Sequence, residues 1–129
     1  MSRVIHFEIH ASEPQRLIDF YTALFGWKVA QWGTMPYWTI TTGAAGEPGI
    51  DGGLVQRRGP RPSEAPAVSS FVCTVQVDAL DDALARCAAL GGMQAVPKMP
   101  IPGVGWLAYA SDPDGNLFGL MQPDPQAKA

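Results

Sequence analysis

The sequence predicts an α+β fold made of two tandem βαβββ modules related by pseudo-twofold symmetry. The first observation behind this prediction is an internal repeat, in which residues that shape the backbone recur 66 positions later. The aligned pairs are Gly26 and Gly92, Pro36 and Pro102, Gly49 and Gly115, and Gly53 and Gly119. The second observation is that each half shows the signals of one strand, one helix and then three strands. We therefore expect a pair of modules, with a pocket at the seam between them.

The composition is that of a single globular domain that is not disordered. The chain has 129 residues, of which 47% are apolar and 16% charged, so it can bury a sizeable core. A net charge of −3 argues against nucleic-acid binding. No long apolar run follows the N-terminus, so we expect neither a signal peptide nor a membrane span. Two cysteines are too few for a disulfide framework, which favours a cytoplasmic protein.

In the first half, Val4 to His10 alternates apolar and polar residues, which predicts a strand. Ser12 is expected to cap the following helix, with Gln15 reaching back to complete a capping box. Apolar residues then recur at helical spacing until Gly26, which is typical of a left-handed helix C-cap. The remaining expected strands of this half are residues 28–31, 37–42 and 52–57.

The second half repeats this order. A strand is expected over Phe71–Val77, and Asp78 is expected to cap a helix over residues 79–90. Asp112 to Gly115 predicts a tight turn, because proline presets φ and glycine accepts a positive φ. The later strands are expected at 94–97, 106–110 and 117–122. The expected divisions of the domain (1–129) are module one at 4–57, a linker at 58–69, module two at 70–122 and a flexible tail at 123–129.

The repeated βαβββ pattern, closed by Asp112-Pro113-Asp114-Gly115-Asn116 and an apolar strand, resembles the vicinal oxygen chelate superfamily. This group includes glyoxalase I, bleomycin-resistance proteins, extradiol dioxygenases and fosfomycin-resistance enzymes. Further residues that carry the resemblance are His6, Phe20-Tyr21, Phe25-Gly26-Trp27 and Gly91-Gly92. Together with Pro100 to Gly105, Phe25-Gly26-Trp27 is similar to a large bacterial glyoxalase-like branch. The resemblance implies that the curved sheets of the modules form a cup, and that members commonly form homodimers, some of which pair modules across chains.

The resemblance also implies a divalent metal at the floor of the cup, held by one side chain from the first and one from the last strand of each module. The first-strand positions correspond to His6 and Val72, and the last-strand positions to Gly53 and Gly119. Three of these four residues carry no donor atom, and a divalent ion needs about four to six ligands. We therefore expect no metal cofactor. The resemblance implies a glutamate at each last-strand position in the metalloenzymes of this group, where this chain has Gly53 and Gly119. It also implies that one of these glutamates is the base of glyoxalase chemistry, so that base is missing here.

One strand face carries the ionisable residues His6, Glu8 and His10. The two imidazoles are about 13 Å apart along a strand, too far to share one ion comfortably. We expect Glu8 and His6 to orient a ligand, and both are candidates for general acid–base catalysis. The corresponding residues of module two, Val72, Thr74 and Gln76, are neutral.

Aromatic residues are expected to line the pocket. Trp38 and Trp106 fit two walls of an apolar slot for a flat ligand. Tyr37 and Tyr109 have the opposite strand parity, so one of the two sets must face away from the cup, and the sequence leaves this open. Three methionines are interpreted as core residues that fill gaps: Met93, Met99 and Met121.

These observations predict a small-molecule-binding protein that is not an active glyoxalase I, with an apolar or aromatic ligand. The alternative is a metal-dependent lyase, isomerase or dioxygenase that holds its metal through His6, Glu8 and further donors. A metal-free enzyme that uses Glu8 or His6 as its base is the third possibility. We further expect a cytoplasmic homodimer that contacts neither nucleic acid nor membrane.

Overall fold

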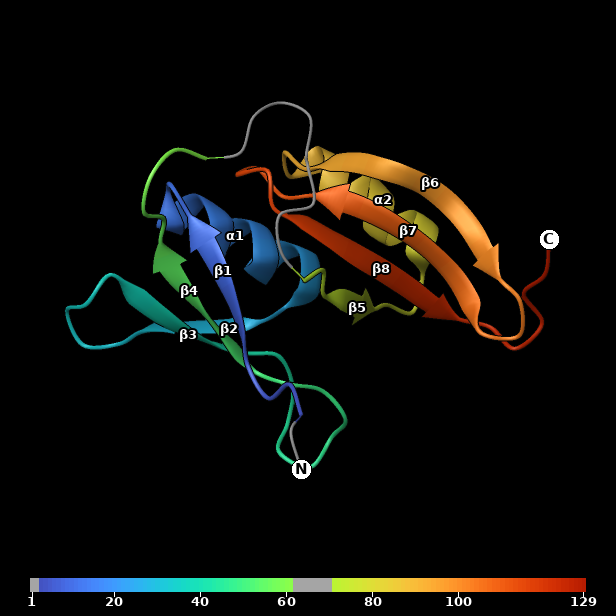
Figure 1. Ribbon diagram of the computed structural model, residues 1–129, viewed down its shortest axis with the longest axis horizontal. Helices are drawn as coiled ribbons and strands as arrows, with labels where there is room; N and C mark the ends of the chain where they lie inside the picture. The colour runs from blue at the N-terminus through green and yellow to red at the C-terminus, as the bar shows by residue number, and fades with distance from the viewer. Residues whose placement is uncertain (1–2, 62–70) are drawn as a thin grey trace. The chain divides into compact units, whose positions relative to one another are not determined.

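The computed structural model describes residues 3–61 and 71–129. The chain divides into two compact units, and the boundary along the sequence falls between Arg61 and Pro62 (Figure 1). Each unit contains one of the two expected modules. Residues 62–69 of the expected linker and residue 70 of the expected second module lie outside the described residues. The closing of the two sheets into a cup stays a prediction.

Both units have the same secondary structure and strand order, which confirms the α+β fold. Module one comprises β1 (Phe7–Ala11), α1 (Pro14–Phe25), β2 (Lys28–Gln31), β3 (Tyr37–Thr41) and β4 (Gly52–Gln56). Module two comprises β5 (Thr74–Gln76), α2 (Leu80–Ala89), β6 (Met93–Ile101), β7 (Gly105–Ser111) and β8 (Leu117–Pro123). The sheets run β1-β4-β3-β2 and β5-β8-β7-β6. In each, the first strand pairs parallel with the last, and the other pairs are antiparallel.

Strand register confirms the repeat to the residue. Glu8 of β1 lies opposite Gly53 of β4, and Thr74 of β5 lies opposite Gly119 of β8. Both members of the second pair are 66 positions beyond those of the first. The sequence offset therefore identifies structurally equivalent positions in the two sheets.

The boundaries of the strands differ from expectation at three places. β1 begins at Phe7 and β5 covers only Thr74–Gln76, so each first strand is shorter than predicted. β6 is longer than predicted, with register shifts between Gln94 and Met99. Two prolines are accommodated in β6 because it is an edge strand, where a missing backbone donor leaves no neighbour unpaired.

Helix α1 ends as predicted but begins differently. Gly26 adopts a φ of 73°, and its N–H donates to the Thr22 carbonyl at 2.9 Å. The N-cap residue is Glu13, without a side-chain cap, so the expected capping box is wrong. Gln15 instead donates to Asp19 Oδ1 at 2.8 Å, one turn further along the helix.

Helix α2 is capped from a distant strand. Its N-cap residue is Ala79, and Asp78 does not cap it as predicted. The Leu80 N–H donates instead to Oε1 of Gln122 in β8, at 2.8 Å. This bond joins the start of the helix to the sheet beneath it, which no local capping pattern can reveal.

The core of module one lies between α1 and its sheet. Leu17, Phe20, Tyr21 and Leu24 form the buried stripe of the helix, and Ile40 and Leu54 are the buried sheet residues below them. Trp27 closes the end of this core, where its ring stacks on Tyr21 with centroids 5.3 Å apart. Burial of this apolar surface is the main source of the module's stability.

The turn between β7 and β8 is organised by a buried carboxylate, Asp112, which is 3% exposed. Its Oδ1 accepts from the N–H groups of Asp114 and Asn116, at 2.8 and 3.0 Å. Replacing Asp112 with alanine leaves the buried Asp114 N–H and the partly buried Asn116 N–H without this acceptor and is expected to cost about 1–3 kcal/mol. Urea unfolding measures the change. Asp78→Ala is the matched control, since Asp78 is exposed and caps nothing; an equal loss in both variants would contradict the assignment.

The C-terminal residues that we expected to form a flexible tail fold back against the turn between β6 and β7. The Asp124 N–H donates to the Val104 carbonyl, and the Gly103 N–H donates to the Ala127 carbonyl. Ala127 is 3% exposed. These bonds connect residues 124–127 to the turn between β6 and β7 of module two.

The two cysteines differ in accessibility. Cys73 is exposed, whereas Cys87 is 1% exposed on the inner side of α2. Burial raises the pKa of the Cys87 thiol, and the charge of Asp112 adds to the effect. In native protein, a thiol reagent such as Ellman's reagent is expected to modify Cys73 quickly and Cys87 only after unfolding. Equal rates for the two thiols in native protein would contradict this.

Within residues 3–61 and 71–129, neither helix is both long and apolar enough to cross a membrane.

Candidate functional site

Each sheet has one face covered by its own helix and one face that points away from it; we call the second the open face. In module one, register and strand alternation place Leu54 and Ile40 on the helix side. Glu8, His10 and Gly53 therefore lie together on the open face.

The side chain of Tyr37 covers Gly53, which has no side chain of its own. A Cβ built on Gly53 would overlap the hydroxyl and ring of Tyr37. The Tyr37 hydroxyl is also 3.2 Å from His6 Nε2, which brings His6, just before β1, to the same face. The open face of module one thus contains a phenol–imidazole pair seated over a glycine.

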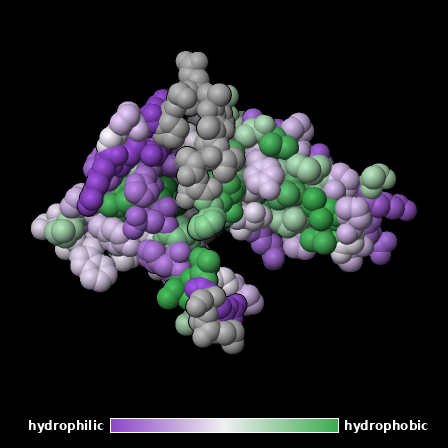
Figure 2. Space-filling model, in the orientation of Figure 1, coloured by the Kyte–Doolittle hydropathy of each residue, from purple (hydrophilic) through white to green (hydrophobic). Residues whose placement is uncertain are grey.

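Glu8 and His10 form a second polar pair beside the first. His10 Nε2 is 3.2 Å from Glu8 Oε1. Their side chains are 47% and 46% exposed, so solvent screens this interaction and it contributes little to stability. Both pairs are available to a molecule that approaches the sheet. Hydrophilic residues predominate over β1 and β4 in Figure 2.

The open face of module two has a different chemistry. Thr74 and Tyr109 lie opposite Gly119, where a Cβ would be 2.7 Å from Thr74 Oγ1 and 3.3 Å from Tyr109 Cε1. Val72, the repeat counterpart of His6, precedes β5 and offers no donor. The position that holds an imidazole in module one is therefore apolar in module two.

The structure resolves the open question of the aromatic residues in favour of the tyrosines. Trp38 lies opposite Leu54, and so it faces the helix side of module one. Trp106 lies opposite Gln122 on the helix side of module two, and its Nε1–H donates to Asp124 Oδ2 at 3.1 Å. The prediction that the two tryptophans share the face of His6 and Glu8 is wrong, because strand register fixes their parity.

The methionines are also not core residues as predicted. Met99 and Met121 both lie opposite Leu107, which places the three residues in one row on the open face of module two. Met93 is 68% exposed. Green patches over β6 to β8 in Figure 2 mark the apolar character of this module.

The residues at the implied metal positions do not fit a divalent ion. Of the four, only His6 has a donor atom, and at Gly53 the space is occupied by Tyr37. Nowhere in residues 3–61 and 71–129 do three or more His, Cys, Asp or Glu side chains gather closely enough to hold an ion. We therefore assign no metal-dependent chemistry to these residues.

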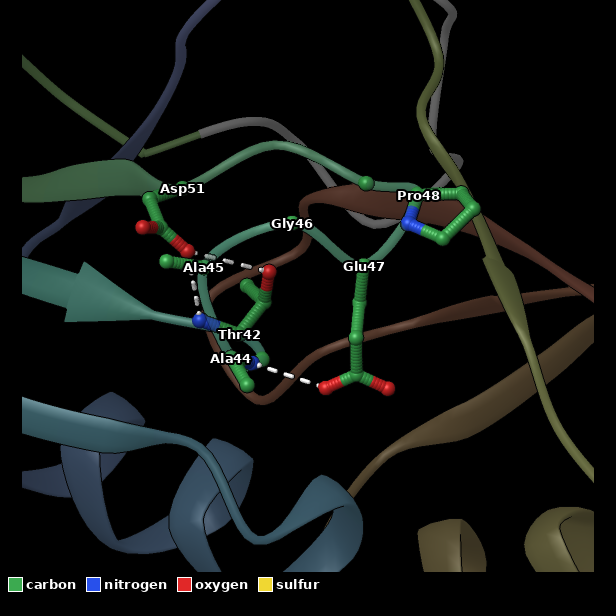
Figure 3. A pocket seen from close by; sticks show the side chains of 9 residues that line it. Thr42, Ala44, Ala45, Gly46, Glu47, Pro48 and Asp51 are labelled. Carbon is green, nitrogen blue, oxygen red and sulfur yellow. Dashed lines mark hydrogen bonds between the residues drawn. The ribbon is translucent and has the colours of Figure 1, made fainter.

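The loop between β3 and β4 encloses a small polar hollow of about 310 Å³, shown in Figure 3. The Ala44 N–H donates to Glu47 Oε1 at 3.0 Å, and the Thr42 N–H donates to Asp51 Oδ1 at 2.8 Å. Both carboxylates thus order the loop's own backbone. The acidic residues of this loop therefore have a structural role.

Sequence reasoning missed Tyr37 as a site residue. Strand alternation places Tyr37 and Trp38 on opposite faces of β3. Only the pairing of β3 with β4 shows which of the two residues faces away from the helix. A usable signal was the glycine at 53, which leaves room for a large neighbour on the same face.

Comparison with known proteins gives a consistent result. A family model described as the Glyoxalase/Bleomycin resistance protein/Dioxygenase superfamily matches residues 3–120. "Putative glyoxylase CFP32" of Mycobacterium bovis and of Mycobacterium tuberculosis is 42% identical over 50 residues. That match covers 39% of this chain and 19% of the relative's length.

Solved structures share the fold at low sequence identity. A mutant of the fosfomycin resistance protein FosX from Listeria monocytogenes, complexed with Mn(II) and 1S,2S-dihydroxypropylphosphonic acid, has a TM-score of 0.71 and 18% identity. The similarity covers 96% of this chain and 92% of that one. A glyoxylase/bleomycin resistance protein/dioxygenase domain from Frankia sp. EAN1pec has a TM-score of 0.69 and 18% identity, over 96% and 99% of the two chains.

Proposed function

The chain belongs to the glyoxalase/bleomycin resistance protein/dioxygenase superfamily, and on this basis we propose that it binds a small organic molecule without the help of a divalent metal. The ligand contacts the open face of module one, where Glu8, His6 and Tyr37 are the polar groups. The ligand consists of a polar group, which these residues contact, and an aromatic or other apolar part.

The observation that carries this proposal is made at Gly53. The resemblance implies a metal-binding carboxylate at this position, and the chain has instead a glycine that is covered by Tyr37. At Gly53 a glutamate side chain has no room while Tyr37 keeps its place. At Gly119 the space beside the backbone is limited in the same way by Thr74 and Tyr109. Both last-strand positions therefore lack a donor and are shielded by neighbouring side chains.

The same replacement argues against proton transfer of the glyoxalase I kind. That chemistry needs a base at the carbon-bound proton and a positive centre for the developing oxyanion. Glu8 is a carboxylate on the open face of module one, but its side chain is half exposed and paired with His10. We assign Glu8 and His6 to orienting the ligand.

The alternative is a metal-dependent lyase, isomerase or dioxygenase. The Mn(II) complex of FosX shows that the fold can hold such an ion in that protein. In this chain the donors would have to come from outside the four implied positions. Binding that requires a metal is the property that separates this alternative from the proposal.

Calorimetric titration of the full chain with 4-nitrophenol and with benzoate tests the proposal. We expect saturable binding that is unchanged by EDTA. Binding of 4-nitrophenol, whose hydroxyl can donate to the Glu8 carboxylate, is expected to be weakened in Glu8→Ala. Glu13→Ala is the matched control, because Glu13 is an exposed carboxylate at the start of α1, outside the open face. Binding that appears only after addition of zinc, nickel, manganese or iron(II) would contradict the proposal.

A further inference from the structure

We propose that Tyr37 and His6 form a hydrogen-bonding anchor that takes over the place of the lost metal–carboxylate centre, and that it binds an acceptor oxygen of the ligand. This inference rests on the proposed function and specifies the chemistry of its ligand. The shared chemistry is a carboxylate or phenolate oxygen attached to an apolar body.

The first step is the coupling between Tyr37 and Gly53. These residues lie on neighbouring strands, with Tyr37 opposite Val55 and Gly53 two positions before it. The phenol crosses this diagonal to cover Gly53, where any Cβ would overlap its hydroxyl. Glycine at 53 is therefore a requirement for the observed position of the tyrosine, and the pair acts as one unit.

The second step is the hydrogen bond to His6. The distance from Tyr37 Oη to His6 Nε2 is 3.2 Å, within hydrogen-bonding range. When His6 donates from Nε2, the Tyr37 oxygen accepts, and the phenolic proton can be donated to a ligand.

The third step is the difference between the modules. Tyr109 lies directly opposite Gly119 and is 3.3 Å from a Cβ built there, whereas Tyr37 reaches Gly53 along the diagonal and fills its Cβ position. At the repeat position of His6, however, module two has Val72. Module two therefore has a tyrosine beside its glycine but no imidazole at the repeat position of His6, and Tyr109 serves as an internal control.

Titration with benzoate and with benzylamine tests the inference in the full chain. We expect benzoate to bind more tightly than benzylammonium, because the anchor donates to an oxygen. Tyr37→Phe removes only the hydroxyl and is expected to weaken benzoate binding about fivefold to tenfold. Gly53→Ala is expected to weaken it similarly by displacing the ring, whereas Tyr109→Phe changes it less than twofold.

Chemical-shift changes of the His6 imidazole on benzoate addition provide a second readout, which a purely structural role of Tyr37 would not produce. Unchanged benzoate affinity in Tyr37→Phe would overturn the anchor while leaving metal-free binding intact. Tighter binding of benzylammonium, or equal losses in Tyr37→Phe and Tyr109→Phe, would also overturn it. Absence of saturable binding by either probe would instead count against the proposed function, which distinguishes the two failures.

Discussion

Replacing Gly52 with alanine is expected to destabilise the protein by about 1–3 kcal/mol, the cost typical of overpacking a filled interior. Gly52 is buried in β4 on the helix side, and a Cβ there would be 2.6 Å from both the carbonyl oxygen and the ring of Phe7. The carbonyl belongs to the backbone of the paired strand β1, so the clash can be relieved only by moving that strand. Thermal or urea unfolding measures the loss.

Gly53→Ala is the control for this substitution. It makes the same chemical change one residue further along, but there the obstructing atoms are at the free end of the Tyr37 side chain. The tyrosine can rotate away, so we expect a smaller loss of stability together with the binding defect described above. A Gly53→Ala variant less stable than Gly52→Ala would contradict this account of the two faces.

Leu120→Ala is expected to cost about 2–5 kcal/mol, as for other fully buried leucines. Leu120 is 0% exposed in β8 and lies opposite Ala108 on the helix side of module two. Its truncation removes apolar contacts and leaves a cavity between sheet and helix. Denaturant unfolding with an unchanged m-value would identify a simple loss of native stability.

Met121→Ala provides the matched comparison at the next residue. Met121 points to the open face and is partly exposed, so its truncation is expected to cost well under half as much as that of Leu120. Equal losses at the two positions would mean that Met121 is a core residue after all. They would then contradict the assignment of the open face in module two.

Much of the fold follows from the repeat and from local signals. The offset of 66 correctly identifies Thr74 and Gly119 as the counterparts of Glu8 and Gly53, because both sheets use the same strand order. Gly26 predicts the end of α1, since only a residue tolerant of positive φ suits that position. The grouping of Glu8 with His10 follows from strand alternation alone.

The features that sequence reasoning missed depend on contacts between distant segments. The Gln122 side chain in β8 accepts a hydrogen bond from the first turn of α2, and the Ala127 carbonyl accepts one from the turn after β6. The orientation of Trp38 depends on the register of β3 with β4. Alternation within one strand shows which residues share a face, but it does not show which face the helix covers. The sequence therefore could not decide between Tyr37 and Trp38 as the residue on the open face.

Metal analysis tests most directly the central claim that the residues at the implied metal positions no longer form a metal site. Untagged protein and a His6→Ala variant are analysed for bound elements as purified and after incubation with zinc, nickel, manganese and iron(II). The account predicts near-zero occupancy in both proteins, because His6 is the only donor at the four positions. Occupancy near one ion per chain that is lost in His6→Ala would contradict it and support the metal-dependent alternative.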